Sequence, residues 1–558
     1  MAINAEYHTE NEGRRDLEKP FIRNQKCVDR EEETVNRGLE NGSIWMVLLS
    51  TSVAVCGSFE FGSCVGYSSP TQAQIRQELN LTLPQYAMFG SIITIGAMIG
   101  AISSGRIADF IGRKGAMRIS AALCIIGWLA VYFAMVRAIN GALWLDIGRF
   151  CTGYGIGIFS YVVPVFIAEI TPKNLRGGLA TVNQLMIVSG SSMAFLLGAV
   201  VTWRTLALTG LIPCILQLVG LCFIPESPRW LAKVGHQNEF ELSLRMLRGK
   251  YADVSKEAAE IQKSIGALQD LPKVQIMDLF HAKYMRPVII GAGLMFFQQF
   301  GGINGIGFYA SETLVAAGFS SGTIGTISYA IIQVPITLLG AILMDRSGRR
   351  PLLMISASGT FIGCLLAAAS FYLKGQSLLL GWVPGLAISG VLVYVASFSI
   401  GMGAVPWVIM SEIFPIHVKG IAGSLVVLVN WSGAWAVSYT FNFLMSWSPP
   451  GNHKNGTYFT RAITTCIGSQ IKYFQIPRDF SEVASFMAPS SFLHHSLTSK
   501  DFKDSTMLYF LRNFWHTSIS GTFSVYAGFC ALAVLFVAKI VPETKGRTLE
   551  EIQASISS

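Results

Sequence analysis

The stretch GRIADFIGRK at residues 105–114 decides the fold, because it recurs as GAILMDRSGRR at residues 340–350. Each copy holds an aspartate, a glycine that permits a tight turn and paired cations, and each lies between two long apolar segments. The two aspartates are 236 residues apart. A second pair of motifs, AEITPKNLRG around Glu169 and SEIFPIHVKG around Glu412, is offset by 243 residues. Two similar offsets predict two similar halves in tandem.

The segments around these motifs have the composition of a membrane protein. The chain has 558 residues, of which 51% are hydrophobic and 13% are charged, whereas a soluble domain has about 25% charged residues. Twelve apolar blocks are each long enough to cross a ~30 Å hydrocarbon core as a helix. Their predicted spans are residues 44–67, 85–107, 116–136, 142–167, 179–201, 204–224, 288–311, 321–344, 351–373, 384–410, 419–446 and 522–541. We therefore expect an all-α membrane protein with twelve transmembrane helices in two six-helix halves, which excludes a single soluble core.

Composition also sets the boundaries between the parts. Residues 1–43 hold 17 charged residues and no apolar run of a signal peptide, so we expect a disordered cytoplasmic tail. Residues 44–224 and 288–541 are expected to form the two six-helix halves. Residues 225–287 have the apolar spacing of short amphipathic helices in a cytoplasmic linker. Residues 542–558 are expected to form a cytoplasmic carboxy-terminal tail.

The net charge of +9 is concentrated in loops on one side of the predicted membrane. Lys and Arg gather between the second and third spans, the fourth and fifth, and the sixth and seventh, and they are sparse in the alternate connections. By the positive-inside rule, the basic loops and both termini lie in the cytoplasm. This distribution explains the charge without nucleic acid, which we do not expect as a partner.

The ten cysteines are scattered, mostly within apolar blocks, and no two form a C-x-x-C pair. They therefore indicate neither a disulfide framework nor a zinc site. The sequence also contains no phosphate-binding loop, nucleophile elbow or metalloprotease motif. We expect a carrier without cofactor or metal, and not an enzyme.

The paired motifs at the cytoplasmic helix ends predict a conformational latch. Ordinary positive-inside anchors would explain the cations, but not the same order of acid, glycine and cation in both halves. We expect ion pairs between the halves that form in one conformation and break in another. The residues assigned to this latch are Asp109, Arg113, Glu169 and Arg176 in the first half and Asp345, Arg349, Glu412 and Lys419 in the second.

The polar residues inside the apolar blocks are few, and most are neutral amides. An amide donates and accepts hydrogen bonds, as a sugar hydroxyl does, and an indole covers the apolar face of a pyranose. The alternative is that these residues join helices to one another. Glycines recur at matching places in the first and seventh spans, which favours a binding site at the middle of the membrane. The candidates are Gln184, Gln298, Gln299, Asn304, Gln333 and Asn430, with Trp407 nearby.

Two ionisable residues, Glu60 and Arg149, lie inside predicted spans. Charged groups are costly in lipid, so each residue should face the protein interior and have a partner. The sequence leaves two roles open for them, a buried ion pair or a site that takes up a proton.

The motifs, in this order, resemble the sugar porter branch of the major facilitator superfamily. The resemblance is carried by GRIADFIGRK, DIGRF, PESPRW, QQFGGIN, DRSGRR and PETKGRTLEEI and covers residues 44 to about 450 and 521–555. Within the branch, FGSCVGYSSPTQ and LEKPFI are similar to segments of the plant monosaccharide carriers named for early response to dehydration. The resemblance implies the major facilitator fold, alternating access and a monosaccharide, expected to be a hexose, bound between the halves.

The resemblance also implies site residues. The family's sugar-contacting amides fall on Gln184, Gln298, Gln299, Asn304 and Gln333, and its contacts from the tenth and eleventh helices fall on Trp407 and Asn430. Tyr309 matches an aromatic residue of the family's outer gate.

Proton coupling is where the chain departs from the family pattern. Proton-coupled members have an aspartate in the first helix, paired with the arginine that Arg149 matches, and here that position is Cys64. Glu60 lies one helical turn earlier, so it is either a displaced proton acceptor or a counter-ion of Arg149. Facilitated and proton-coupled transport both stay open.

A short stretch near the amino end resembles a sorting signal of the family. LEKPFI, with Leu17, Phe21 and Ile22, has Phe-Ile where the family's leucine-based vacuolar signal has Leu-Leu. We expect recognition by the sorting machinery and a location in the vacuolar membrane, with the plasma membrane as the alternative.

The second half contains an extra segment. PESPRW at Glu226 recurs as PETKGR at Glu543, 317 residues later, which is about 74 more than the other offsets. The excess matches residues 452–521, a long outer connection that holds four of the eight histidines. We expect an unspliced intron or a lineage-specific loop that is disordered and unnecessary for transport.

For the function of the whole chain, the alternatives to a monosaccharide carrier are a polyol or inositol carrier, a non-transporting sugar sensor, and a variant that the insertion inactivates.

Overall fold

The structure is a computed structural model that describes residues 44–134, 141–172, 175–249, 252–269, 276–319, 322–414, 418–446 and 518–545. Over those ranges the chain forms helices and turns and has no strand. The all-α membrane fold predicted from the sequence is confirmed. The predicted amino-terminal tail with its sorting signal, residues 452–517 of the predicted insertion and residues 546–558 lie outside the described residues. The last four residues of the predicted insertion, 518–521, belong to a helix that begins at Ser518, so the predicted boundary at residue 521 is wrong.

The amino-terminal half consists of α2 (Ile44–Gly66), α3 (Ser68–Leu79), α4 (Leu83–Tyr132), α5 (Gly141–Ile170), α6 (Arg176–Gly198), α7 (Trp203–Thr209) and α8 (Leu211–Gly220). Within it, α4 contains two antiparallel segments joined at Gly112, whose φ of +83° lies outside the helical region. Residues 93–101 run parallel to α5, whereas residues 120–127 run antiparallel to it, so the chain reverses direction at this glycine. The two segments correspond to the predicted spans 85–107 and 116–136.

The carboxy-terminal half consists of α12 (Ala282–Phe300), α13 (Ile303–Phe308), α14 (Ala310–Ala317), α15 (Thr323–Ser347), α16 (Arg349–Gly375), α17 (Val383–Ser397), the π-helix η2 (Phe398–Met402), α18 (Val405–Ile413), α19 (Lys419–Ser446) and α24 (Ser518–Lys539). Two of its segments are interrupted. Gly302, with φ +99° and the Tyr526 ring against it, separates α12 from α13. The Gly301 carbonyl, next to this break, accepts a hydrogen bond from the Tyr394 hydroxyl at 3.0 Å. The second interruption is η2, a single π-helical turn between α17 and α18.

Ten helices in the described ranges are long and apolar enough to cross a membrane. One of the ten is α4, which crosses twice because of its reversal. Residues 282–317 form the interrupted α12, α13 and α14, none of which is counted among the ten. The second crossing of α4 and one crossing by α12, α13 and α14 are added to the ten. The architecture is then consistent with twelve membrane crossings, each near its predicted span.

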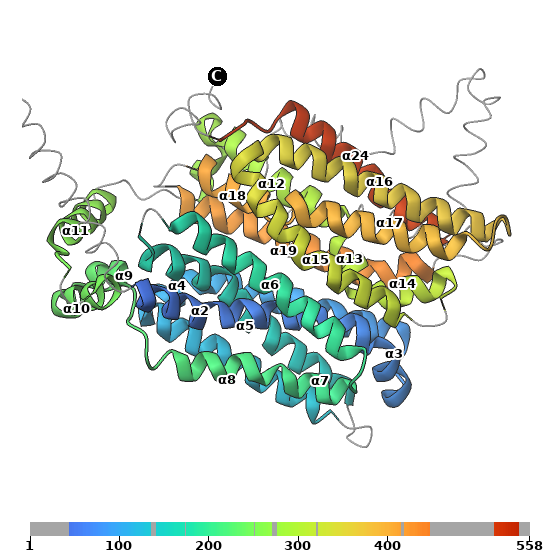
Figure 1. Cartoon of the computed structure of the whole chain (residues 1–558), viewed down its shortest axis with the longest axis horizontal. Helices are drawn as coiled ribbons and strands as arrows, with labels where there is room; N and C mark the ends of the chain where they lie inside the picture. The colour runs from blue at the N-terminus through green and yellow to red at the C-terminus, as the bar shows by residue number, and fades with distance from the viewer. Residues whose placement is uncertain are drawn as a thin grey trace, which may run out of the picture.

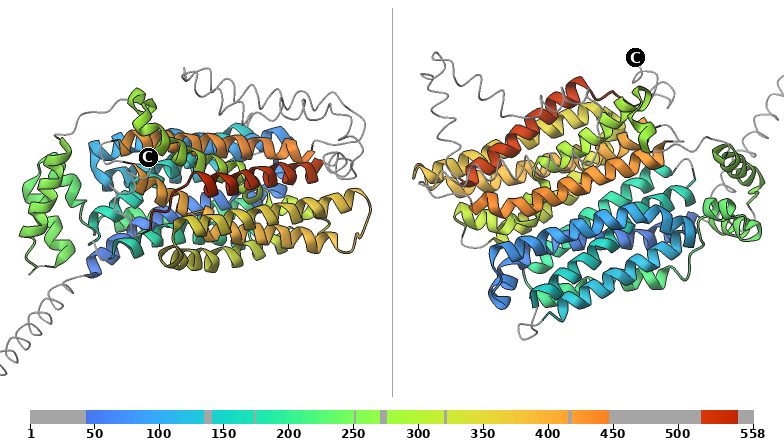
Figure 2. Two further views of the ribbon diagram at one scale, coloured as in Figure 1. Left: turned by 90° about the horizontal axis from the view of Figure 1, so that it is seen from above. Right: turned by 180° about the vertical axis from the view of Figure 1, so that it is seen from behind.

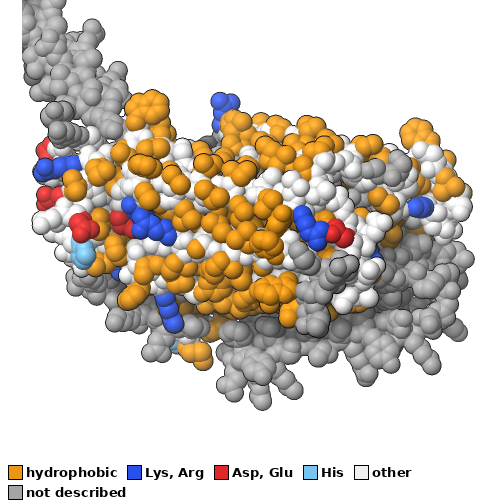
Figure 3. Space-filling view, turned by 90° about the horizontal axis from the view of Figure 1, so that it is seen from below, with side chains coloured by type: hydrophobic (Ala, Val, Ile, Leu, Met, Phe, Trp, Pro, Cys, Tyr) orange, Lys and Arg blue, Asp and Glu red, His pale blue; other side chains and the backbone are white. Residues whose placement is uncertain are grey.

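The two halves lie side by side, the amino-terminal half below and the carboxy-terminal half above in Figure 1. The linker helices α9 (Pro228–Val234), α10 (Gln237–Arg248) and α11 (Ser255–Gln269) lie at one end of the bundle (Figures 1 and 2), and the short η1 (Ile276–Phe280) precedes α12. We call this end the linker end and the opposite one the far end. Figure 3 shows hydrophobic side chains across the middle of one face and charged side chains mainly toward the linker end, as a bilayer requires.

Candidate functional site

Amides from α12, α13 and α19 form one hydrogen-bonded row, the amide row. The Nε2 atom of Gln299 donates to Oδ1 of Asn430 at 2.7 Å, and Nδ2 of Asn304 donates to Oε1 of Gln299 at 2.5 Å. Gln299 is 7% exposed and Asn430 is 4% exposed. Because α19 also packs against α4, the row lies on helices that border the amino-terminal half.

Gln298 joins the amide row to the interrupted α17–α18 segment. Its Nε2 donates to the carbonyl of Met402 at 2.6 Å and to that of Gly403 at 3.2 Å, both at the end of η2. Its Oε1 is buried and has no hydrogen-bond partner in the part of the chain that the structure describes. A buried acceptor without a donor is costly, so this oxygen is available to a ligand hydroxyl.

Gln333 on α15 connects the two halves directly. Its Oε1 accepts hydrogen bonds from Ser191 and Ser192 of α6, at 3.1 and 3.5 Å. Gln184, two turns earlier on α6, and Trp407, near the start of α18, are half-buried. The structure thus brings Gln298, Gln299, Asn304 and Asn430 together and gives Gln333 a partner on the other half.

Two tryptophans of α19 were missed by the sequence analysis. Trp431 follows Asn430 directly, and its ring lies 6.0 Å between centroids from Phe61 of α2, across the boundary between the halves. The indole nitrogens of Trp431 and Trp435 are buried without a hydrogen-bond partner among the described residues. Indole donors beside amides suit a ligand with several hydroxyls. The signal was their position on the same helix as Asn430.

An apolar cavity lies elsewhere, within the amino-terminal half. It has a volume of about 380 Å³ and is lined by α2, α4, α6, α7 and α8, with side chains such as Phe59, Met193 and Leu216. An apolar lining does not match sugar hydroxyls, so we place the candidate site at the amide row.

The halves contact each other at the far end. The Ser311 backbone N–H donates to Oγ of Ser69 at 3.1 Å. Nη1 of Arg76 lies 3.3 Å from Oε1 of Glu312. Both contacts join α3 of the amino-terminal half to α14 of the carboxy-terminal half, so the far end is held together by polar contacts.

Tyr309, the predicted gate residue, lies in this closed region between α13 and α14. Its side chain is fully buried, its ring stacks on Phe441 with 5.2 Å between centroids, and its hydroxyl donates to the Ser438 carbonyl at 3.3 Å. The hydroxyl also lies against Gly90 of α4, where an added Cβ would be only 2.6 Å away. A larger residue at position 90 would therefore force the Tyr309 hydroxyl to move.

At the linker end, the predicted latch residues of the amino-terminal half form a compact cluster. Arg113 is 6% exposed, and its Nε and Nη2 atoms contact the two carboxylate oxygens of Glu169 at 2.8 Å each. Its Nη1 also lies 3.3 Å from Asp109. Such bidentate pairing is strong and geometrically specific.

The carboxy-terminal half repeats this arrangement. Nη2 of Arg349 lies 3.0 Å from Oε1 of Glu412. The Nζ atom of Lys419 donates to the Ser411 carbonyl at 2.8 Å. The side chains of Arg176 and Asp345 lie outside the described part.

In this structure the observed ion pairs lie within each half, and pairs between the halves in another conformation stay a prediction. Arg113 and Glu169 belong to one half, and Arg349 and Glu412 belong to the other. The reason is local, since each repeated glycine turn places its arginine beside the end of a helix of the same half.

Two carboxylates that were not among the predicted site residues accept hydrogen bonds from the backbone at the Gly112 and Gly348 turns. Glu226 accepts the backbone N–H groups of Arg113 at 3.2 Å and Lys114 at 3.0 Å, and Glu543 accepts those of Arg349 and Arg350 at 3.1 Å each. Burial raises the pKa of Glu226, although these backbone donors oppose it. Burial also acts to raise the pKa of Glu543, but hydrogen bonds from backbone N–H groups lower it overall. The repeated PES and PET motifs were the signal for these residues.

Glu60 and Arg149 are both fully buried, but they do not form a direct ion pair with each other in the structure. Oε1 of Glu60 accepts from the Trp128 indole at 2.5 Å and from the Cys64 thiol at 3.1 Å. Nη1 of Arg149 donates to the Cys64 carbonyl at 2.8 Å, and Nη2 donates to Oγ of Ser68 at 2.5 Å. The counter-ion role expected as one alternative for Glu60 is therefore not observed, because Cys64 lies between the two groups.

The chain was compared with known proteins. The family model described as sugar (and other) transporter matches residues 49–479 and 506–555, and the unmatched residues between them fall inside the predicted insertion. Sugar transporter ERD6-like 16 of Arabidopsis thaliana is 61% identical over 541 residues, which cover 97% of this chain and 95% of that protein. Sugar transporter ERD6-like 7 of the same plant is 53% identical over 513 residues, which cover 92% and 94%.

Solved structures of sugar porters share the fold. The proton:xylose symporter XylE bound to 6-bromo-6-deoxy-D-glucose is 26% identical with a TM-score of 0.66, covering 91% of this chain and 98% of that chain. The inward-open xylose transporter XylE from E. coli is 25% identical with a TM-score of 0.65, covering 91% and 99%. Together with the family match over most of its length, these likenesses show that the chain belongs to the sugar (and other) transporter family and is a sugar transporter of the major facilitator superfamily, not an enzyme.

Proposed function

We propose that this transporter carries hexoses across the membrane by alternating access, as a facilitator that uses no proton gradient. The observation that carries the proposal is the amide row at the border between the halves. Donor and acceptor atoms of Gln298, Gln299 and Asn304 match the hydroxyls of a monosaccharide, each of which donates and accepts. A bound hexose analogue in the XylE structure supports this substrate class.

The substrate's apolar face has candidate partners in the same region. Trp407 on α18 and Trp431 on α19 belong to helices that carry or contact the amide row. Gln184 and Gln333 complete the proposed site from α6 and α15. Closure of the two halves around the sugar would bring α6 and α15 closer together. Gln333 on α15 is already bonded to Ser191 on α6.

The contacts between the halves support alternating access. Tyr309, Ser311 and Glu312 lie at the closed far end, and we propose that this end faces away from the cytoplasm. At the linker end, the pairs of Arg113 and Arg349 lie within the halves, so the halves can separate there without breaking them. We propose that the latch residues stabilise each half as a rigid unit while the halves rock.

The contacts of the first helix support the proposed absence of proton coupling. A coupled carboxylate must exchange its proton with water and change its partner during the cycle. Glu60 is fully buried and already accepts from Trp128 and Cys64, and the two terminal nitrogens of Arg149 donate to a carbonyl and a hydroxyl. These contacts favour a structural role for both residues.

We further propose the vacuolar membrane as the location, on the basis of the sorting motif.

The test of sugar binding replaces single amides. Gln298→Ala and Asn304→Ala each remove hydrogen bonds to the substrate, a loss of about 1 to 3 kcal/mol, or roughly 5- to 150-fold in affinity. Gln262→Ala is a matched control, because this amide also makes a hydrogen bond, at 2.9 Å, but belongs to the linker. Labelled hexose uptake is measured at equal surface abundance. Wild-type uptake by both amide variants would contradict the site, and stronger competition by inositol than by hexose would contradict the substrate class.

A further inference from the structure

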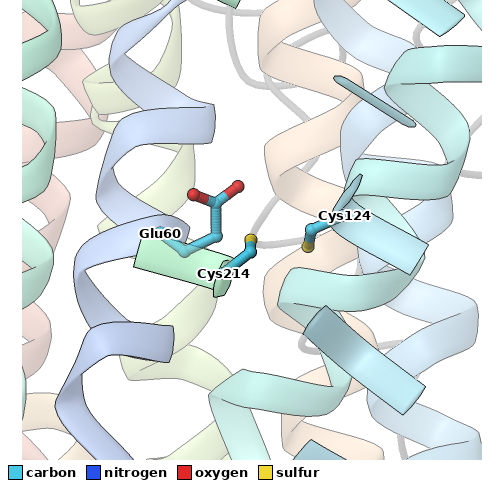
Figure 4. A group of neighbouring side chains, drawn as sticks. All are labelled: Glu60, Cys124 and Cys214. Carbon is cyan, nitrogen blue, oxygen red and sulfur yellow. The ribbon is translucent and has the colours of Figure 1, made fainter. Parts of the chain in front are cut away.

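A cluster of one carboxylate and two thiols lies in the core of the amino-terminal half, apart from the amide row. It consists of Glu60 on α2, Cys124 on α4 and Cys214 on α8 (Figure 4), all with no exposed surface. One ligand atom from each residue lies within 4.8 Å of the other two. The Cys64 thiol lies beside them, 3.1 Å from Oε1 of Glu60.

The carboxylate of this cluster is only half satisfied. Its Oε1 accepts hydrogen bonds from Trp128 and Cys64, whereas its Oε2 is buried and has no partner among the residues that the structure describes. A buried carboxylate oxygen without a donor or cation is costly. In Figure 4 the carboxylate and both sulfur atoms face a common space between the three helices, so the carboxylate group that carries the unpartnered oxygen lies next to two further ligand atoms.

The geometry is close to that of a tetrahedral metal site. Zinc binds cysteine sulfur at ~2.3 Å and carboxylate oxygen at ~2.0 Å, which places neighbouring ligand atoms about 3.5 to 3.8 Å apart. The observed separations, all within 4.8 Å, require an approach of about 1.3 Å or less.

We propose that Glu60, Cys124 and Cys214 bind one divalent cation of the zinc class, with Cys64 as the nearest candidate for a fourth donor. Both thiols lose their protons to solvent on binding, so that two thiolates and one carboxylate face a doubly charged ion. The remaining negative charge is offset by Arg149, whose guanidinium holds the Cys64 carbonyl at 2.8 Å. Thiolate ligands select zinc and cadmium over magnesium and calcium.

Such a cation would join α2, α4 and α8, which all belong to one half. It would therefore stabilise that half without linking it to the other, so this inference does not depend on the proposed function. The sequence carried no signal for the site, because its ligands are 64 and 90 residues apart and no C-x-x-C pair is present.

The test uses the purified full-length chain in detergent, stripped of metal and kept reduced. Cadmium is titrated while the thiolate-to-cadmium charge-transfer absorption is recorded, and we expect one ion per chain. Cys124→Ser and Cys214→Ser should each abolish this signal, and Glu60→Gln should weaken binding at least tenfold. Cys364→Ser, which removes a buried thiol of the carboxy-terminal half, is the matched control and should leave the signal intact. Zinc should raise the melting temperature of the wild type but not of Cys214→Ser.

Folding of each variant is checked by a single symmetric elution peak, and Cys124→Ala replaces any serine variant that aggregates. Absence of cadmium binding, or binding that survives both the Cys124 and Cys214 substitutions, would overturn the proposal. A disulfide between Cys124 and Cys214, detected by alkylation of the denatured chain prepared without reductant, would overturn it too. If the wild-type protein binds cadmium as expected but takes up no sugar, that result would contradict only the proposed function.

Discussion

Gly90 offers a direct test of how the far end closes. A Cβ at this position would lie 2.6 Å from the Tyr309 hydroxyl oxygen, whereas non-bonded heavy atoms pack at about 3.5 Å or more. Gly90→Ala therefore overlaps by roughly 0.9 Å with a fully buried side chain from the other half. Overpacking of this kind costs about 1 to 3 kcal/mol. We expect this cost to fall on the conformation in which the far end is closed.

The same contact predicts a rescue. That cost shifts the conformational equilibrium roughly 5- to 150-fold toward the open far end, and hexose uptake should fall because each cycle passes through the closed state. Removing the hydroxyl leaves Cζ of residue 309 as the nearest atom, 3.4 Å from the added Cβ, which is an ordinary contact. Gly90→Ala combined with Tyr309→Phe should therefore recover most of the uptake, apart from the lost hydrogen bond to Ser438.

The assay is initial uptake of labelled hexose in transport-deficient yeast cells at equal surface abundance. Gly528→Ala serves as the control, because an added Cβ there meets no atom within 4 Å. Uptake by Gly90→Ala equal to that of the wild type would refute the reasoning. A double variant no better than Gly90→Ala alone would show that the hydroxyl contact is not the cause.

The other expectations concern the insertion, the latch and the sorting signal. A chain without residues 452–517, which leaves α24 intact from Ser518, should carry hexose at least as well as the full chain, and loss of uptake by a well-expressed shortened protein would count against this. Arg113→Ala should lower the melting temperature, because the half-buried Glu169 carboxylate loses its cation and keeps the hydroxyl of Ser227 as a donor. The cost should fall below the roughly 3 to 5 kcal/mol of breaking a fully buried pair, and an unchanged melting temperature would contradict the pairing. Replacing Leu17, Phe21 and Ile22 by Ala should move a tagged chain away from the vacuolar membrane in microscopy, and an unmoved chain would exclude the signal.

The fold was predictable because it depends on features that repeat along the chain. Apolar length fixes a crossing helix, and the recurrence of the Gly112 and Gly348 motifs fixes two equivalent halves. The glycines of the seventh span agree with the break at Gly302, but the matching glycines of the first span, such as Gly57 and Gly62, lie in α2, which is continuous from Ile44 to Gly66. The crossing helices and their glycine turns depend on backbone conformation. Local sequence determines that conformation, so these features can be predicted.

The contacts of the candidate site were less predictable, because they join residues far apart in sequence. Arg113 lies 56 residues before Glu169, and nothing in either motif distinguishes this partner from one in the other half. Glu60 bonds to Trp128, 68 residues later, instead of the expected Arg149. Trp431 was overlooked because an apolar segment gives no sign of which aromatic face borders the other half. Packing between helices decides such pairs.

The central claim, that this chain carries hexose without a proton gradient, is tested most directly by the purified protein in proteoliposomes. Uptake of labelled hexose down its concentration gradient is measured with and without an imposed pH gradient, and with protein-free vesicles as the blank. We predict saturable uptake that is above the blank and equal in the two conditions. Accumulation above the equilibrium level only in the presence of an inward proton gradient would contradict the facilitator, and no uptake above the blank would contradict hexose transport itself.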